Sequence, residues 1–254
     1  KIADIYSYNI AINLFAKVGK WQETLVLKEE MSVNGIKADS HTFDGVIRAC
    51  GKSGKWDMAV KILFDMNKKY KFKPESRHFC SAMDACSKAG EAEKTLRLLD
   101  MMGVYEMERP PHAWTAAILA LSRCGQWESA CDLFETMKDE CDSLNDEKLI
   151  VTEACYNAVM VACAHAGEWH KALLYFQEMI KNDIKPSDTT YLTLLSAFSP
   201  KYGVNSQHKD IEYKATAYKR LSDLMKKKGI KTADISPIKF KNLSAYNASR
   251  EETE

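Results

Sequence analysis

A short motif with a central glycine recurs along this chain and restricts it to one class of architecture. The motif reads AKVGKW, GKSGKW, SKAGEA, SRCGQW and AHAGEW, and its glycines are Gly19, Gly54, Gly90, Gly125 and Gly167. The steps between them are 35, 36, 35 and 42 residues. A glycine that recurs in this way is typical of the end of a helix in a repeated helix-turn-helix, because glycine adopts left-handed backbone without a Cβ clash. The period therefore predicts a helical-repeat solenoid.

The copy at residues 51–56, GKSGKW, has a second interpretation as a phosphate-binding loop. Such a loop needs one G-x-x-x-x-G-K-[ST] between a strand and a helix, with its lysine directly before Ser or Thr. Here Lys55 precedes Trp56, and the motif recurs along the chain. We therefore interpret it as a structural turn.

Each unit of the repeat reads as two amphipathic helices, since apolar residues recur at intervals of three and four. Neither helix of a pair can bury its apolar stripe without a neighbour, so we expect an all-α, right-handed superhelical solenoid of roughly twelve helices. The expected array covers residues 1–233, with units at 5–39, 40–75, 76–110, 111–152 and 153–187, a degenerate unit at 188–233, and an irregular charged tail at 234–254.

Two interruptions and one recurring aromatic residue refine this prediction. The acidic segment DECDSLNDEKLIV in the fourth unit reads as a surface loop, and SPKYGVNSQHKD splits the sixth unit. A tryptophan follows the repeat glycine by two residues in four units. These residues are Trp21, Trp56, Trp127 and Trp169. We expect them to be buried between helices, because the placement repeats at a core-type position.

Composition narrows the functional classes. The 254 residues carry a formal net charge of +1, and no apolar stretch approaches the length that crosses a bilayer. The eight cysteines form no C-x-x-C pair, and Cys50, Cys86 and Cys163 each precede a repeat glycine by four residues, which indicates packing between helices. No catalytic or metal-ligating constellation is present in the sequence, so we expect a binding protein without enzymatic activity, cofactor or small-molecule substrate.

The segments SYNIAINLFAKVGK and YNAVMVACAHAGEWHKALLYFQEMI, with the unit endings GIKAD and DIKPS, resemble the pentatricopeptide repeat (PPR) family over about residues 5–233. The tetratricopeptide repeat is the nearest alternative, but its period is 34 and its tryptophan lies early in the first helix. The resemblance implies recognition of single-stranded RNA along the first helices, one nucleotide per repeat. It also implies work in chloroplasts or mitochondria, with a targeting segment outside this chain.

In this family the fifth and the last residue of each repeat select the base. The resemblance therefore implies base-selecting roles for Asn9 with Asp39, for Thr115, and for Asn157 with Ser187. The first pair resembles the uridine combination, and the last pair resembles a pyrimidine combination that leans to cytidine.

The other units depart from the family pattern. They carry Asp44 with Glu75, Cys80 with Pro110, and Leu192 with Ala233, while Thr152 is a candidate partner of Thr115. Carboxylates repel phosphate, and cysteine with proline offers a base edge few hydrogen bonds. We therefore expect only two or three units to read a base.

Two further registers recur at the repeat period. Cations lie two residues before the glycines, at Lys17, Lys52, Lys88 and Arg123, with His165 in the fifth unit. They either contact an RNA backbone or complement helix dipoles. The second residues of the first four units, which either stack bases or anchor a protein, are Tyr6, His41, Arg77 and His112.

The sequence leaves two hypotheses for function. The first is an organellar adaptor that binds single-stranded RNA and affects the processing, stability or translation of transcripts. The second is a non-catalytic scaffold subunit of a large organellar protein or ribonucleoprotein complex, which the near-neutral charge favours.

Overall fold

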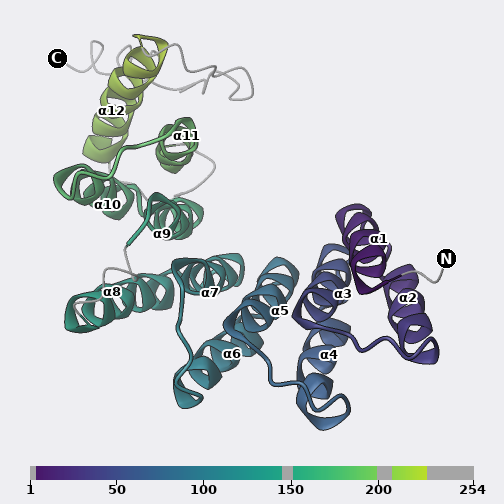
Figure 1. Ribbon diagram of the computed structural model, residues 1–254. Coiled ribbons are helices and arrows are strands. Elements are labelled where there is room, and N and C mark those ends of the chain that lie inside the picture. The colour runs from purple at the N-terminus through teal and green to yellow at the C-terminus, as the bar shows by residue number, and fades with distance from the viewer. Residues whose placement is uncertain (1–3, 145–150, 199–207, 228–254) are drawn as a thin grey trace, which may run out of the picture. The chain divides into compact units, whose positions relative to one another are not determined.

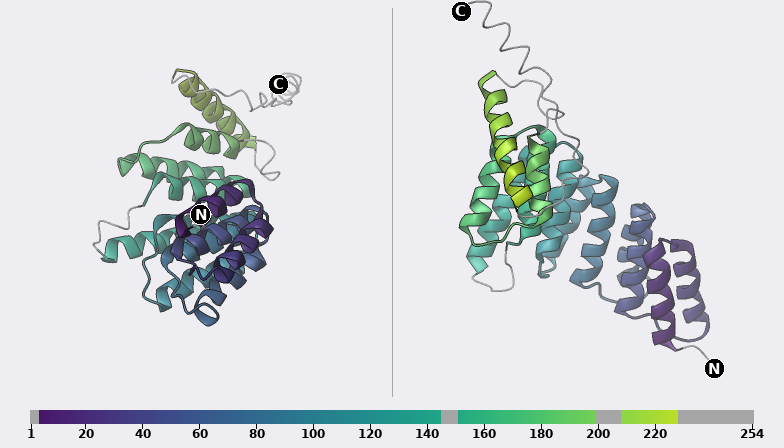
Figure 2. Two further views of the ribbon diagram at one scale, coloured as in Figure 1. Left: turned by 45° about the vertical axis from the view of Figure 1, so that its right-hand side comes forward. Right: turned by 90° about the horizontal axis from the view of Figure 1, so that it is seen from above.

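The computed structural model describes residues 4–144, 151–198 and 208–227, and these residues form α-helices and turns without a strand (Figure 1, Figure 2). The chain divides into two compact units, residues 1–155 and 156–254. None of the helices in the described ranges is long and apolar enough to span a membrane.

The helices alternate between first and second members of a pair. In the first unit they are α1 (Ile5–Val18), α2 (Trp21–Val33), α3 (Ser40–Lys52), α4 (Trp56–Lys68), α5 (Ser76–Ala89), α6 (Ala92–Val104), α7 (Pro111–Arg123) and α8 (Trp127–Leu144). The later helices are α9 (Glu153–Ala166), whose first turn contains the division between the units, α10 (Trp169–Lys181), α11 (Asp188–Ala197) and α12 (His208–Lys227).

The repeat glycines form the turns between paired helices, as the period predicts. All five have a positive φ, from 71° to 81°. At the end of α1 the Gly19 N–H donates to the Ala16 carbonyl over 3.2 Å, and the Lys20 N–H donates to the Phe15 carbonyl over 3.0 Å. The left-handed residue thus satisfies carbonyls at the end of the helix and redirects the chain into the second helix.

The first unit is built of two layers. Helices α1, α3, α5 and α7 pack side by side in sequence order (Figure 1). Helices α2, α4 and α6 each pack against their own first helix and the next one, and α8 packs against α7. Small residues allow the first helices to approach closely. A Cβ atom on Gly45 of α3 would lie 2.7 Å from Ile12 Cγ2, and one on Gly51 would lie 2.8 Å from the Cβ atom of Ala85. The first helices therefore form a continuous layer whose outer face is open.

A tyrosine at the fourth position of a repeat ties the two helices of a pair together. The hydroxyl of Tyr8 donates to Glu30 Oε1 over 2.8 Å and accepts from Asn34 Nδ2 over 2.9 Å. In the second unit Tyr156 makes the corresponding contacts, to Glu178 over 3.2 Å and from Asn182 over 2.8 Å. The same polar network thus fixes the geometry of repeats in both units.

The prediction that the recurring tryptophans are core residues is right only for Trp169, which is 3 % exposed. Trp21, Trp56 and Trp127 are half-buried, although each begins a second helix as Trp169 does. Trp169 differs in packing against the ring of Phe198, with the ring centroids 5.6 Å apart. The layers of the first unit are filled instead by rings such as Phe43 and Trp114.

The acidic segment of the fourth unit is not entirely a loop. Helix α8 continues to Leu144, and its last turns are anchored where Glu140 Oε2 accepts from Arg109 Nη2 over 2.6 Å. The remaining residues 145–150 lie outside the described ranges, as do the interruption at 199–207 and the predicted tail at 234–254.

Candidate functional site

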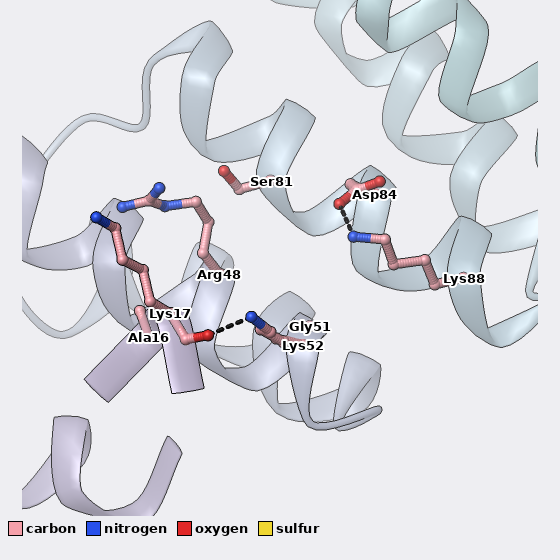
Figure 3. Close-up of a pocket in the computed structure, with 8 residues that line it drawn as sticks. All are labelled: Ala16, Lys17, Arg48, Gly51, Lys52, Ser81, Asp84 and Lys88. Carbon is pink, nitrogen blue, oxygen red and sulfur yellow. Dashed lines mark hydrogen bonds and ion pairs between the residues drawn. The ribbon is translucent and has the colours of Figure 1, made fainter. Parts of the chain in front are cut away.

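The predicted site residues of the first unit lie on the first helices or directly before them. Two hollows lie on these helices. One, of about 340 Å³, is lined by α1, α3 and α5 (Figure 3). The other, of about 670 Å³, includes Asp44, Cys80, His112 and Thr115. Both expose polar side chains from successive repeats, so a ligand lying along the layer would meet several repeats in turn.

Asn9 and Asp39, predicted as a base-selecting pair, lie together in the structure. The amide Nδ2 of Asn9 donates to Asp39 Oδ1 and Oδ2 over 3.1 and 3.2 Å. Asp39 is also the N-cap of α3, and its Oδ1 accepts from the Thr42 N–H over 2.8 Å. The Thr42 hydroxyl lies 2.6 Å from Asn9 Oδ1. The side chain of Asn9, the fifth residue of the first repeat, is therefore held between two residues. They are Asp39, the last residue of the same repeat, and Thr42, the third residue of the next repeat.

The Asp39 carboxylate is stabilised in its charged form. Burial raises the pKa of Asp39, but the hydrogen bonds from Thr42 and Asn9 outweigh burial and lower it below the ordinary value of 3.8. At neutral pH this group therefore offers only acceptor oxygens, one of which it shares with the N-terminus of α3.

The second predicted pair lies in the second unit. Asn157 is half-buried on α9, and Ser187 is the N-cap of α11. The Ser187 N–H donates to Thr190 Oγ1 over 3.3 Å, and the Ser187 hydroxyl lies 2.7 Å from that of Thr189. Ser187 thus occupies the same capping place relative to α11 as Asp39 does relative to α3.

The Thr115 hydroxyl donates its proton to a backbone carbonyl of its own helix. Its Oγ1 donates to the Pro111 carbonyl over 2.8 Å and lies 3.5 Å from Cys155 Sγ, which is also 3.3 Å from Thr152 Oγ1. The thiol lies between the two threonines, so this unit offers a base an acceptor oxygen but no free donor from Thr115.

Asp44, the fifth residue of the second unit, is neutralised by neighbours that the sequence reading missed. Its Oδ1 accepts from Ser81 Oγ over 2.6 Å, and its Oδ2 lies 3.1 Å from Arg48 Nε. Arg48 also donates from Nη2 to Asn13 Oδ1 over 2.5 Å. Only the ion pair had a signal in the sequence, because Asp44 and Arg48 are four residues apart on one helix.

The four predicted backbone cations differ in their partners. Lys52 Nζ donates to the Lys17 carbonyl at the end of α1, and Arg123 Nη1 donates to the Ser87 carbonyl over 2.9 Å near the end of α5. Lys88 pairs with Asp84 over 2.5 Å. Lys17 and Arg48 both line the smaller hollow (Figure 3). Helix-end capping therefore accounts for Lys52 and Arg123.

The predicted stacking residues are exposed at the first turns of α1, α3, α5 and α7. Tyr6 is 71 % exposed, and His41 and His112 are exposed as well. Arg77 is exposed, but its Nε lies 3.0 Å from Glu75 Oε2. The four planar groups are therefore accessible from solvent, although one is paired. No three His, Cys, Asp or Glu side chains within the described residues are close enough to bind a metal ion.

Comparison with known proteins assigns these repeats to one family. A model of the PPR repeat family matches residues 3–52 and 151–199, and a model of the PPR repeat matches residues 41–70, 77–105 and 112–141. The matches cover more than half of the chain.

Curated relatives carry the same repeats. A pentatricopeptide repeat-containing protein of Arabidopsis thaliana is 29% identical over 167 residues, which are 65% of this chain and 26% of the relative. A mitochondrial protein of the same kind from that plant is 25% identical over 182 residues, 72% of this chain and 22% of the relative. A chloroplastic one is 30% identical over 99 residues, 39% of this chain and 11% of its own. The chain thus spans about a quarter or less of these relatives.

Solved structures support the fold. The pentatricopeptide repeat protein PPR10 from maize aligns with all of this chain and 35% of its own, with a TM-score of 0.65 and 20% identity. The PPR domain of protein-only RNase P 1 from Arabidopsis thaliana, solved in complex with tRNA, covers 74% of this chain and 94% of its own, with a TM-score of 0.56 and 15% identity. These likenesses show a helical-repeat solenoid.

Proposed function

This chain belongs to the pentatricopeptide repeat family, and from that premise we propose that it binds single-stranded RNA along the open face of its first helices. Two of its structural relatives were solved with RNA, PPR10 with an 18-nucleotide RNA element and the RNase P domain with tRNA. In this proposal the chain is a non-catalytic adaptor, and any reaction on the RNA belongs to other domains or partners.

The observation that carries the proposal is the arrangement of Asn9 and Asp39. The Asn9 amide shares one hydrogen between the two Asp39 oxygens, which leaves its second hydrogen to donate. Asp39 Oδ2 accepts only from Asn9 among the described residues, so it can also accept from a base. A donor beside an acceptor matches the edge of uracil, where a carbonyl oxygen adjoins the N3–H.

The same pair disfavours cytosine. The N3 atom of cytosine is an acceptor, and it would face the charged Asp39 carboxylate where uracil presents a donor. Two facing acceptors leave both without a hydrogen bond, and a site built to hydrogen-bond one group rejects an analogue that lacks it. We therefore expect the first repeat to prefer uridine.

The RNA backbone is expected to follow Lys17 and Arg48. Both residues line the 340 Å³ hollow and lie on adjacent first helices (Figure 3). Lys17 makes no ion pair among the described residues, and Arg48 retains donors beyond those used for Asp44 and Asn13. Lys52 and Arg123 contribute less in this proposal, because their nitrogens already serve helix ends.

A scaffold role is the second candidate, and one observation favours it. Asp44 is held by Ser81 and Arg48 with both carboxylate oxygens, and Cys80 beside it is 5 % exposed. The second and third repeats therefore offer a base few free groups, which suits a surface that contacts protein. In this alternative the chain is a subunit of a large organellar protein or ribonucleoprotein complex.

An organellar setting accompanies either function. Several curated relatives are named chloroplastic or mitochondrial. For this chain we propose the same compartments, with processing, stability or translation of organelle transcripts as the processes that RNA binding would affect.

The salt dependence of RNA binding tests the proposal. For single strands log K falls with log salt by about 0.7 per neutralised phosphate. Replacing both Lys17 and Arg48 with Ala should therefore flatten the slope by about 1.4, whereas replacing the exposed Lys61 of α4 should leave it unchanged. Absence of single-stranded RNA binding in the wild type would favour the scaffold role.

A further inference from the structure

Building on the proposed RNA-binding function, we infer that Thr42 is a positioning residue that sets the base preference of the repeat before its own. Thr42 is the third residue of the second repeat and is fully buried, so it cannot touch RNA itself. It acts through the orientation of the Asn9 amide. The arrangement makes base selection in the first repeat a property of two consecutive repeats.

Thr42 forms a hydrogen-bond network with Asp39 and Asn9. Its Oγ1 accepts from the Asp39 N–H over 3.3 Å and lies 2.6 Å from Asn9 Oδ1. The hydroxyl also lies 2.9 Å from Asp39 Oδ1, but that oxygen already accepts from the Thr42 N–H over 2.8 Å. A hydroxyl has one proton, and the shorter contact assigns it to the Asn9 carbonyl.

The hydroxyl proton of Thr42 determines whether the carbonyl or the NH2 end of the Asn9 amide faces Thr42. With Oδ1 toward Thr42, Asn9 turns its Nδ2 toward the Asp39 carboxylate and keeps a hydrogen for the base. The flipped amide would put its carbonyl against the carboxylate and would present an acceptor to the base. If the hydroxyl is removed, Asn9 Oδ1 loses its donor in a partly buried place, and the side chain rotates toward water to regain one.

The second and third repeats lack this arrangement. His78 has the place of Thr42 in the third repeat, and its Nδ1 accepts from the Glu75 N–H over 2.9 Å. Its Nε2 lies 3.0 Å from the Ser40 carbonyl and 3.3 Å from the Ser40 hydroxyl, so both ring nitrogens have partners other than Asp44. In the fourth repeat the place is held by Ala113, which has no polar side chain. In the fifth repeat the place is held by Cys155, whose Sγ lies 3.5 Å from Thr115 Oγ1, but a threonine has no amide whose two ends could be exchanged. Among the first four repeats, therefore, only the first has a fifth-residue amide that is oriented in this way.

The first arm of the test uses the protein without RNA. Selective ¹⁵N labelling of asparagine follows the Asn9 side-chain amide in the wild type, T42V, T42S and T95V. Thr95 is also fully buried, and its hydroxyl donates within α6 to the Glu91 carbonyl over 2.8 Å, so T95V controls for loss of a buried hydroxyl. We expect T42V alone to shift the Asn9 signals toward those of exposed amides and to accelerate their exchange. An unchanged Asn9 amide in T42V would overturn the inference.

The second arm compares two RNAs that differ by uridine or cytidine at the position read by the first repeat, located by selection from a random library. We expect a preference of roughly tenfold for uridine in the wild type, T42S and T95V, which corresponds to one hydrogen bond. In T42V the preference should fall to within about twofold. If T42V keeps the wild-type preference, Thr42 has no positioning role, although RNA binding stands. If the wild type binds no single-stranded RNA, the proposed function and this role are both wrong, whatever the amide signals show.

Discussion

Lys52, near the C-terminal end of α3, donates a hydrogen bond from Nζ to the backbone carbonyl of Lys17 at the end of α1. The same relationship recurs two repeats later, where Arg123 donates to the Ser87 carbonyl over 2.9 Å and to its hydroxyl over 2.8 Å. A cation at a fixed place in one repeat thus caps the first helix of an earlier one. Two of the cations that recur at the repeat period therefore join one repeat to the repeat before it.

Replacing Lys52 with Ala should destabilise the first unit. The change removes a charged donor from the negative end of α1, so we expect a loss of about 0.3–1 kcal/mol in the free energy of unfolding. Urea denaturation measures it. Lys61→Ala on the exposed face of α4 is the matched control, and an equal loss in both variants would contradict the capping role.

The loss of stability on replacing a tryptophan should depend on how deeply its ring is buried. Trp169→Ala removes a ring that is 3 % exposed and packs 5.6 Å from the Phe198 ring, so it should cost about 3–5 kcal/mol. Trp56→Ala removes a half-buried ring and should cost about 1–2 kcal/mol. Denaturation curves of the two variants should therefore differ clearly, and equal costs would show that the burial of the ring does not decide its contribution.

A glycine at position 106 should stabilise the protein. Glu106 has φ 52°, a left-handed conformation, at the place where the first repeat has Gly35 with φ 71°. Relief of the Cβ clash exceeds the extra chain entropy of glycine, so Glu106→Gly should gain about 0.5–1 kcal/mol. Glu108→Gly, two residues further on at a position without positive φ, should lower the melting temperature instead. A lower melting temperature in both variants would contradict the argument.

The ionisation of Asp39 should make the free energy of unfolding depend on pH in the acidic range. Because its pKa is lower in the folded protein than the ordinary 3.8, its contribution is fully present above that value and is lost as the pH falls through the folded pKa. Asp39→Asn should therefore be less stable than the wild type at pH 7, and the difference should shrink as the pH is lowered below about 4. Urea denaturation between pH 7 and pH 3 tests this, and a constant difference would argue against a charged, hydrogen-bonded carboxylate.

The glycine period was sufficient to predict the fold, because the position of a turn follows from which residue can adopt positive φ. The pairing of Asn9 with Asp39 followed from the resemblance to the family. The contacts of Thr42, Ser81 and Arg48 could not be predicted in the same way. They join residues more than 30 positions apart, and they depend on how each first helix is rotated against the one before it. The burial of Trp21, Trp56 and Trp127 was predicted wrongly for a related reason. Periodicity indicates that these residues have equivalent positions in the repeat, but it does not indicate how deeply each side chain is buried.

Base preference at the first repeat tests the central claim most directly. The wild type and Asn9→Ala would each be titrated with two single-stranded RNAs that differ only by uridine or cytidine at the position assigned to this repeat. The donor left on Asn9 and the acceptor on Asp39 predict that the wild type binds the uridine RNA roughly tenfold more tightly and that Asn9→Ala binds both about equally. Equal binding of the two RNAs by the wild type, or an unchanged preference in Asn9→Ala, would contradict it.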